Sequence, residues 1–168
     1  MAIVKATYTK SRGGAKASIR YIQNRPGKDN QTQSRTLFGS DGYMGRWQAY
    51  QMIDAAEKGS LFFRFVMSPD PKQEDSDKAI HLRDVTEKTM LSLEERLNKQ
   101  IAWVAVEHAD HAPHRHVHVV AIVPGRLQVQ DFQAMRQVAT DACVAQRQQR
   151  DLARDEQAQQ REAVQWEI

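Results

Sequence analysis

The chain of 168 residues lacks the features of a disulfide-linked protein and those of a membrane-spanning one. Its single cysteine, Cys143, excludes a disulfide within the chain and fits a reducing cytoplasm, where we expect the protein to reside. No apolar run approaches the ~20 residues that a transmembrane helix needs, so we expect no membrane insertion. What remains is a soluble globular protein whose length suits one domain with a buried core.

Acidic residues are scarce in the first third of the chain. Residues 1–50 contain two of them against nine lysines and arginines, a net charge of +7, whereas the whole chain carries only +3. This asymmetry predicts that the N-terminal third meets a polyanion, with nucleic acid as the leading candidate. Ordinary surface charge that contacts only solvent explains the same composition. Composition therefore does not distinguish nucleic-acid binding from a solvated surface, and sequence motifs are needed.

Hydrophobic periodicity predicts an α+β domain in which helices pack on one or both faces of a central antiparallel sheet of about five strands. The expected strands cover residues 2–8, 35–38, 60–67, 101–108 and 116–123. The expected helices cover residues 15–24, 44–57, 76 or 77 to about 99, and 132 onward, and residues 11–14 are expected to end the first strand before the first helix. Composition divides the chain into a domain at residues 1–145 and a polar tail at residues 146–168, which we expect to be helical or partly disordered.

Five of the six histidines lie within the fourteen residues from position 107 to position 120. In a strand, every second side chain points to the same face, so His116 and His118 would lie together. If the strands at 101–108 and 116–123 pair as a hairpin, His108 joins them on the same face. Neutral imidazole is the commonest protein ligand for divalent transition metals, and three ligands leave positions open for catalysis. The pattern therefore predicts a metal site formed by His108, His116 and His118.

Other residues of this segment leave alternatives open. Asp110 is expected either to orient a ligand or to hold the turn, and His111 and His114 are expected to contact ligands or solvent. A register in which His114 and His116 form the pair is also possible. A group of hydrogen-bonded histidines without a metal is the non-functional interpretation of the whole cluster.

Three segments resemble motifs of conjugative relaxases, which belong to the HUH endonucleases. Glu107-His108, a polar loop with an aspartate, and then His-Val-His-Val-Val at 116–120 resemble the third motif of that family. The segment Ile-Arg-Tyr-Ile-Gln-Asn-Arg-Pro-Gly-Lys at 19–28 resembles the N-terminal motif of the mobilisation relaxases, and 63–69 is similar to their central strand and its Ser-Pro exit. The tyrosine precedes the histidines, as in relaxases, and the resemblance covers residues 2–145. The loop from 108 to 116 is about a residue longer than usual, and the chain resembles a bare relaxase core without the large C-terminal domains common in the family.

The resemblance implies a ferredoxin-like HUH fold and a strand-specific DNA-nicking activity. Tyr21 would be the nucleophile, with Asp110 as a candidate proton acceptor, and His108, His116 and His118 would hold Mn²⁺ or Mg²⁺, with Zn²⁺, Co²⁺ or Ni²⁺ as alternatives. Single-stranded DNA at a transfer origin would be nicked and rejoined through a 5′-phosphotyrosyl intermediate, which initiates plasmid or element mobilisation together with accessory relaxosome proteins. The residues expected to contact DNA phosphates are Lys10, Arg12, Lys16, Arg20, Arg25 and Lys28.

Two other functions compete with this one. The alternating histidines at 114–118 resemble the motif of histidine-triad nucleotide hydrolases, which need no metal, although Arg115 stands where that family has an apolar residue. The second competitor is a DNA-binding module that is not catalytic and holds a structural metal. Under either competitor, Tyr21 would be an aromatic residue packed on an amphipathic helix.

Overall fold

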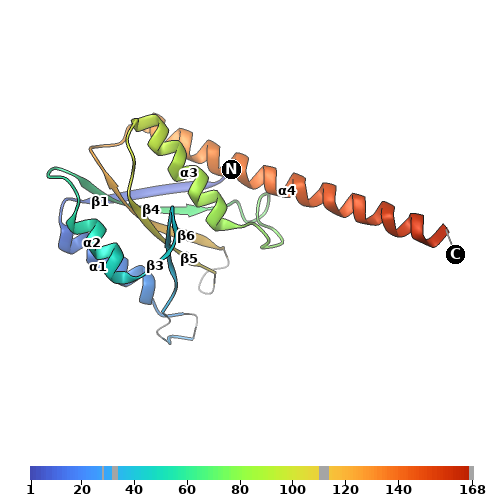
Figure 1. Ribbon diagram of the computed structural model, residues 1–168, viewed down its shortest axis with the longest axis horizontal. Helices are drawn as coiled ribbons and strands as arrows, with labels where there is room; N and C mark the ends of the chain where they lie inside the picture. The colour runs from blue at the N-terminus through green and yellow to red at the C-terminus, as the bar shows by residue number, and fades with distance from the viewer. Residues whose placement is uncertain (28, 32–33, 110–113, 167–168) are drawn as a thin grey trace.

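A single antiparallel sheet organises the chain in the computed structural model, which describes residues 1–27, 29–31, 34–109 and 114–166 (Figure 1). The strand order is β1-β4-β6-β5-β2-β3, and the α+β prediction is confirmed. The strands are β1 (Ile3–Thr9), β2 (Leu37–Gly39), β3 (Gly42–Met44), β4 (Leu61–Ser68), β5 (Trp103–His108) and β6 (His116–Val123). The helices are α1 (Arg12–Asn24), α2 (Arg46–Asp54), α3 (Leu82–Leu97) and α4 (Val129–Trp166).

The sheet has a hydrophobic core on each face. Helices α3 and α4 cover one face and bury Val117 and Val119 of β6, whereas α1 and α2 cover part of the other face and bury Val120 (Figure 1). On the α1 side, Val104 and Val106 of β5 complete the core. Side chains of β6 thus alternate between the two cores, as predicted, because neighbouring residues of a strand point to opposite faces.

Helix α1 begins earlier than the sequence predicts. Ser11 is its N-cap, and the hydroxyl oxygen of Ser11 accepts a hydrogen bond from the backbone N–H of Gly14 at 3.0 Å. The strand ends before residues 11–14, as predicted, but the predicted helix start at about residue 15 is wrong, because the cap places both glycines in the first helical turn. Ala15, Ile19 and Ile22 then face the sheet and are buried.

Two further boundaries differ from the prediction. The sheet has six strands, because the turn after β2 folds back into β3 through Gly42, whose φ of 113° suits glycine. The long helix expected from residue 76 or 77 begins at Leu82. Before it, the carboxylate of Asp75 accepts the backbone N–H of Ile80 at 3.2 Å, which holds this segment as a loop.

Helix α4 continues to Trp166, and its second half extends away from the rest of the molecule (Figure 1). Residues 151–166 are all exposed, so the polar tail is a solvated helix, one of the two predicted states. Cys143 lies in the first half of α4 and is buried, and burial raises its thiol pKa to about 12. None of the described helices has the length and apolarity that crossing a membrane requires.

Candidate metal centre

The β5–β6 hairpin brings three histidines together on the α1 face of the sheet. His108 pairs with His116, and Val106 pairs with His118, so the three imidazoles point the same way. One ring nitrogen from each histidine lies within 4.8 Å of the other two, and the ring centroids are 4.6 to 5.3 Å apart. The structure thus brings the three predicted ligands into one group that could hold a metal ion, and the exposed His114 is not part of it.

His108 is oriented by helix α1. Its Nε2 lies 2.7 Å from the backbone carbonyl oxygen of Ile22, and the side chain is only 1% exposed. Because a carbonyl oxygen can only accept, Nε2 must carry the proton and donate it. The lone pair of His108 is therefore on Nδ1, which has no hydrogen-bond partner among the described residues. An imidazole that donates to a carbonyl and keeps its other nitrogen free has the arrangement usual for a metal ligand.

The other two imidazoles also fit a bound cation. Both ring nitrogens of His118 are buried, and neither has a hydrogen-bond partner in the described part of the chain. A buried polar group without a partner destabilises a fold by about 1–3 kcal/mol, and coordination of one nitrogen would remove part of that penalty. The Nδ1 of His116 lies 3.2 Å from the carbonyl oxygen of His114, which leaves Nε2 as its ligand nitrogen when Nδ1 donates.

Burial keeps His108 and His118 of the cluster neutral at physiological pH. Burial is the largest cause that lowers the pKa of His108 from 6.5 to about 4 and that of His118 from 6.5 to about 3. Nearby positive charge acts in the same direction, with Arg35 on His108 and Arg25 on both. Neutral imidazole is the form that binds metals, so proton competition with a cation is weak near pH 7.

We expect the metal-free protein to lose stability as the pH falls from about 6.5 toward 4. In the unfolded chain both histidines regain their ordinary pKa of 6.5 and bind protons in this interval, whereas in the folded chain they remain neutral. Proton uptake then favours the unfolded state, by up to about 3 kcal/mol for His108 alone at 1.36 kcal/mol per pKa unit. Urea denaturation across this pH interval measures the change.

A matched pair of variants tests whether the histidine cluster causes this pH dependence of stability. His118→Leu should reduce it, because an apolar side chain of similar size has no proton to gain. His81→Gln changes an exposed histidine at the start of α3 and should retain the full dependence. Equal slopes of unfolding free energy against pH in the two variants would contradict an origin in the cluster.

Tyr21 lies on the helix that contacts this cluster. It directly precedes Ile22, whose carbonyl accepts from His108, and it is 55% exposed. At 100° per residue, Tyr21 shares one side of α1 with Gly14, Ser18 and Arg25. Gly14 and Ser18 line a cavity of about 360 Å³ between α1 and strands β1 and β4, and Arg25 is close enough to lower the pKa of both buried histidines. The side of α1 that carries Tyr21 is thus the side that borders the open sheet surface.

The basic residues predicted to contact DNA have different surroundings. Lys10 and Arg20 are exposed, and Arg25 lies near the histidines. Lys16 forms an ion pair with Asp54 at 2.7 Å, and Arg12 donates to the carbonyl oxygen of Ala56 at 2.7 Å. Lys28, Asp110 and His111 lie outside the described residues.

Two arginines near the cluster were missed in the sequence. Gln23 of α1 accepts a hydrogen bond from Arg46 Nε at 2.8 Å and donates to the carbonyl oxygen of Arg35 at 3.1 Å. This network ties both arginines to the end of α1, and Arg35 lowers the pKa of His108. The only sequence signal was the general positive charge of residues 1–50, which does not say which cations come together.

A third missed residue is Arg64 of β4. The segment Leu-Phe-Phe-Arg-Phe-Val-Met contains one cation in an otherwise apolar strand, and that interruption was the signal available in the sequence.

No protein-family model, curated protein or solved structure matches this chain. The case for a function therefore depends on the residues and geometry of this site.

Proposed function

We propose that the protein is a metal-dependent relaxase that nicks and rejoins single-stranded DNA through Tyr21. One observation carries the proposal. His108 of the histidine cluster forms a 2.7 Å hydrogen bond with the carbonyl oxygen of Ile22, the residue that follows the candidate nucleophile. The exposed side chain of Tyr21 thus belongs to the residue next to the one that contacts the cluster, although His108 and Ile22 are 86 positions apart in the chain.

His108, His116 and His118 would hold a divalent ion, with Mn²⁺ or Mg²⁺ as the first candidates. Such an ion, when bound, supplies positive charge that stabilises the negative charge developing on the scissile phosphate. The contribution of the chain is to keep His108 and His118 neutral through burial, which lowers the pKa of both. The carbonyl oxygen of Ile22 orients the imidazole of His108.

Tyr21 would attack the phosphorus in line with the bond to the 3′ oxygen of the preceding nucleotide. A bond forms between the phenol oxygen and phosphorus, and the bond between phosphorus and the 3′ oxygen breaks. The phenol proton is lost, and the departing oxygen gains a proton to become a 3′-hydroxyl. The phosphotyrosyl bond conserves the phosphodiester, so the reverse attack of that hydroxyl rejoins the strand without another energy source.

Positive charge around the site would hold the strand during these steps. Arg20 precedes Tyr21 on α1, Arg25 is the C-cap of that helix, and Arg35 and Arg46 lie near its end. Lysine and arginine contacts to phosphates give affinity without sequence preference. The substrate in the cell would be a transfer origin in the cytoplasm, acted on together with accessory relaxosome proteins.

The histidine-triad hydrolase has no support from the arrangement of these side chains. That mechanism needs His114 beside His116 and His118, but His108 takes that place in the cluster. Arg115, which interrupts the triad pattern, forms an ion pair with Asp75 at 2.7 Å. The two functions also differ in their response to chelation, because EDTA should abolish nicking and leave a triad hydrolase active.

A labelled single-stranded DNA pool with a randomised segment tests the proposal. Incubated with the protein and Mn²⁺, 3′-end-labelled DNA should form an adduct that survives denaturing electrophoresis, since Tyr21 stays on the 5′ phosphate of the downstream fragment. The same DNA labelled at its 5′ end should release a shortened free strand. EDTA should suppress both products. Label retained from the 5′ end would indicate the opposite polarity, and no adduct from any pool would contradict the proposed activity.

A further inference from the structure

Arg64 is an exposed cation in the interior of the sheet. Strand β4 is flanked by β1 and β6, and its other residues from Leu61 to Met67 are buried apart from the half-buried Val66. Arginine at such a position interrupts a surface that would otherwise continue the apolar core. A charged side chain within an apolar surface indicates that this position binds a ligand of opposite charge.

No partner for the Arg64 guanidinium is found within the described part of the chain. Other arginines of this protein are held by carboxylates, such as Arg83 by Glu87 at 3.0 Å and Arg96 by Asp131 at 3.1 Å. The side chain of Arg64 has neither an ion pair nor a hydrogen bond to a described residue. Its five N–H donors therefore remain available to an anion from outside the chain.

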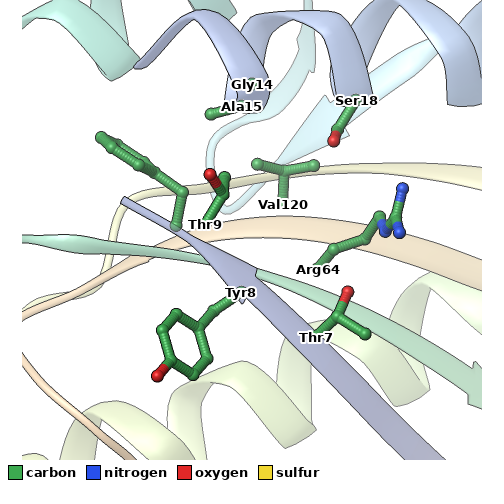
Figure 2. A pocket seen from close by; sticks show the side chains of 9 residues that line it. Thr7, Tyr8, Thr9, Gly14, Ala15, Ser18, Arg64 and Val120 are labelled. Carbon is green, nitrogen blue, oxygen red and sulfur yellow. The ribbon is translucent and has the colours of Figure 1, made fainter. Parts of the chain in front are cut away.

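Residues with hydroxyl groups line the same cavity as Arg64. Arg64 lines the cavity of about 360 Å³ together with Thr7, Thr9 and Ser18. Figure 2 shows α1 crossing over the strands, with Ser18 and Arg64 directed into the space between helix and sheet, whereas the ring of Tyr8 points to the other side. A cation with neighbouring hydroxyl donors in a solvent-open hollow suits an oxyanion such as a phosphate.

The sheet register places this hollow beside the histidine cluster. Arg64 is paired with Val120, and the next residue on the same face of β4, Val66, is paired with His118. Arg64 and His118 are thus diagonal neighbours on one face, a relation that separates residues by roughly 7–8 Å. An extended DNA strand that has one phosphate at the histidines can place a neighbouring phosphate at Arg64.

We propose that Arg64, assisted by Thr7 and Ser18, forms a second phosphate site that binds the phosphate next to the scissile one. The site rests on the proposed function for its substrate, single-stranded DNA, but its own chemistry is that of a phosphate anion. Its role is to position the strand along the sheet, so that the phosphorus to be attacked stays at the histidines. Tyr21, on the same side of α1 as Ser18, then meets a strand held at two points.

Equilibrium binding of a fluorescein-labelled oligothymidylate of about 20 nucleotides tests this site without requiring cleavage. Arg64→Gln should weaken binding about tenfold and lower the slope of log affinity against log salt by about 0.7, the value for one lost phosphate contact on a single strand. Arg64→Lys should keep most of the slope. Arg154→Gln removes an equal charge from the exposed part of α4 and should change neither quantity beyond the small effect of net charge.

Ser18→Ala provides a second measurement that leaves the charge unchanged, in case Arg64→Gln folds poorly. It should weaken binding by roughly two- to tenfold, as expected for the loss of one ordinary hydrogen bond. Equal salt slopes for Arg64→Gln and Arg154→Gln, together with native affinity in Ser18→Ala, would overturn the second phosphate site.

The outcomes separate this inference from the nicking activity. A reduced slope in Arg64→Gln without any covalent adduct in the native protein would support the phosphate site and refute the relaxase. An adduct with unchanged slope would do the reverse. Thermal stabilisation by inorganic phosphate at constant ionic strength that depends on Arg64, with no effect of Arg64→Gln on oligothymidylate binding, would assign the hollow to a free anion and overturn its role in DNA binding.

Discussion

Tyr21→Phe is expected to abolish the covalent protein–DNA adduct. The yield of adduct should fall by at least about a thousandfold, because the substitution removes the phenol oxygen through which the protein would bond to phosphorus. The aromatic ring remains, and the side chain is 55% exposed, so the fold should be unaffected. Noncovalent binding of single-stranded DNA should persist. Denaturing electrophoresis measures the adduct, and fluorescence anisotropy measures binding by the same preparation.

Tyr43→Phe is the matched control for this experiment. Tyr43 is also an exposed tyrosine, at 75%, but it lies on β3 and outside the motif at 19–28. Its hydroxyl should be dispensable for adduct formation. An adduct that persists in Tyr21→Phe would exclude Tyr21 as the nucleophile, and mass spectrometry of the DNA-linked peptide would then identify the residue that carries the phosphate.

His118→Ala is expected to have the second large effect, a loss of Mn²⁺ affinity of a hundredfold or more, with a parallel loss of nicking. Removal of a group that only orients a ligand typically lowers metal affinity by about 10–100-fold, so removal of a ligand should do at least as much. Two imidazoles would remain, too few to hold an ion against water. Calorimetric titration of the chelator-treated protein with Mn²⁺ measures the affinity directly.

His114→Ala and a chelation cycle complete that test. His114 is exposed and outside the cluster, so its replacement should leave Mn²⁺ affinity and nicking near native levels. EDTA should remove the activity of the native chain, and excess Mn²⁺ should restore it. Loss of affinity in His114→Ala with retention in His118→Ala would show that the ligand set is the alternative pair and that the hairpin register differs from the one described.

The histidine cluster could be predicted from the sequence because it depends on local structure, two adjacent strands of one hairpin. The alternation of His116, Val117 and His118 is the two-residue period of a strand, and a hairpin of two adjacent strands adds His108 with no long-range information. The same period correctly assigned Val117 and Val119 to the opposite core.

The errors in the fold also have local causes. The turn at Gly39–Gly42 was predicted, but the three-residue strand β3 that follows it has too few residues to show a period. At residues 76–81, the helix prediction depended on Ser76 or Asp77 as a cap, whereas Asp75 instead stabilises a loop through the backbone of Ile80. Ser11 caps α1 at a segment whose two glycines suggested a break.

By itself, the sequence determined the α+β class, the three histidines on one face of a hairpin and the positive charge of the N-terminal third. Each of these follows from spacing or composition along a short stretch of chain. Only the tertiary structure decided that the carbonyl oxygen of Ile22 orients His108 and that Arg35 and Arg46 lie together at the end of α1. It also decided that Arg64 lines a cavity beside His118. Those contacts join positions far apart in the chain, and they depend on how helix α1 crosses the sheet, which no local pattern specifies.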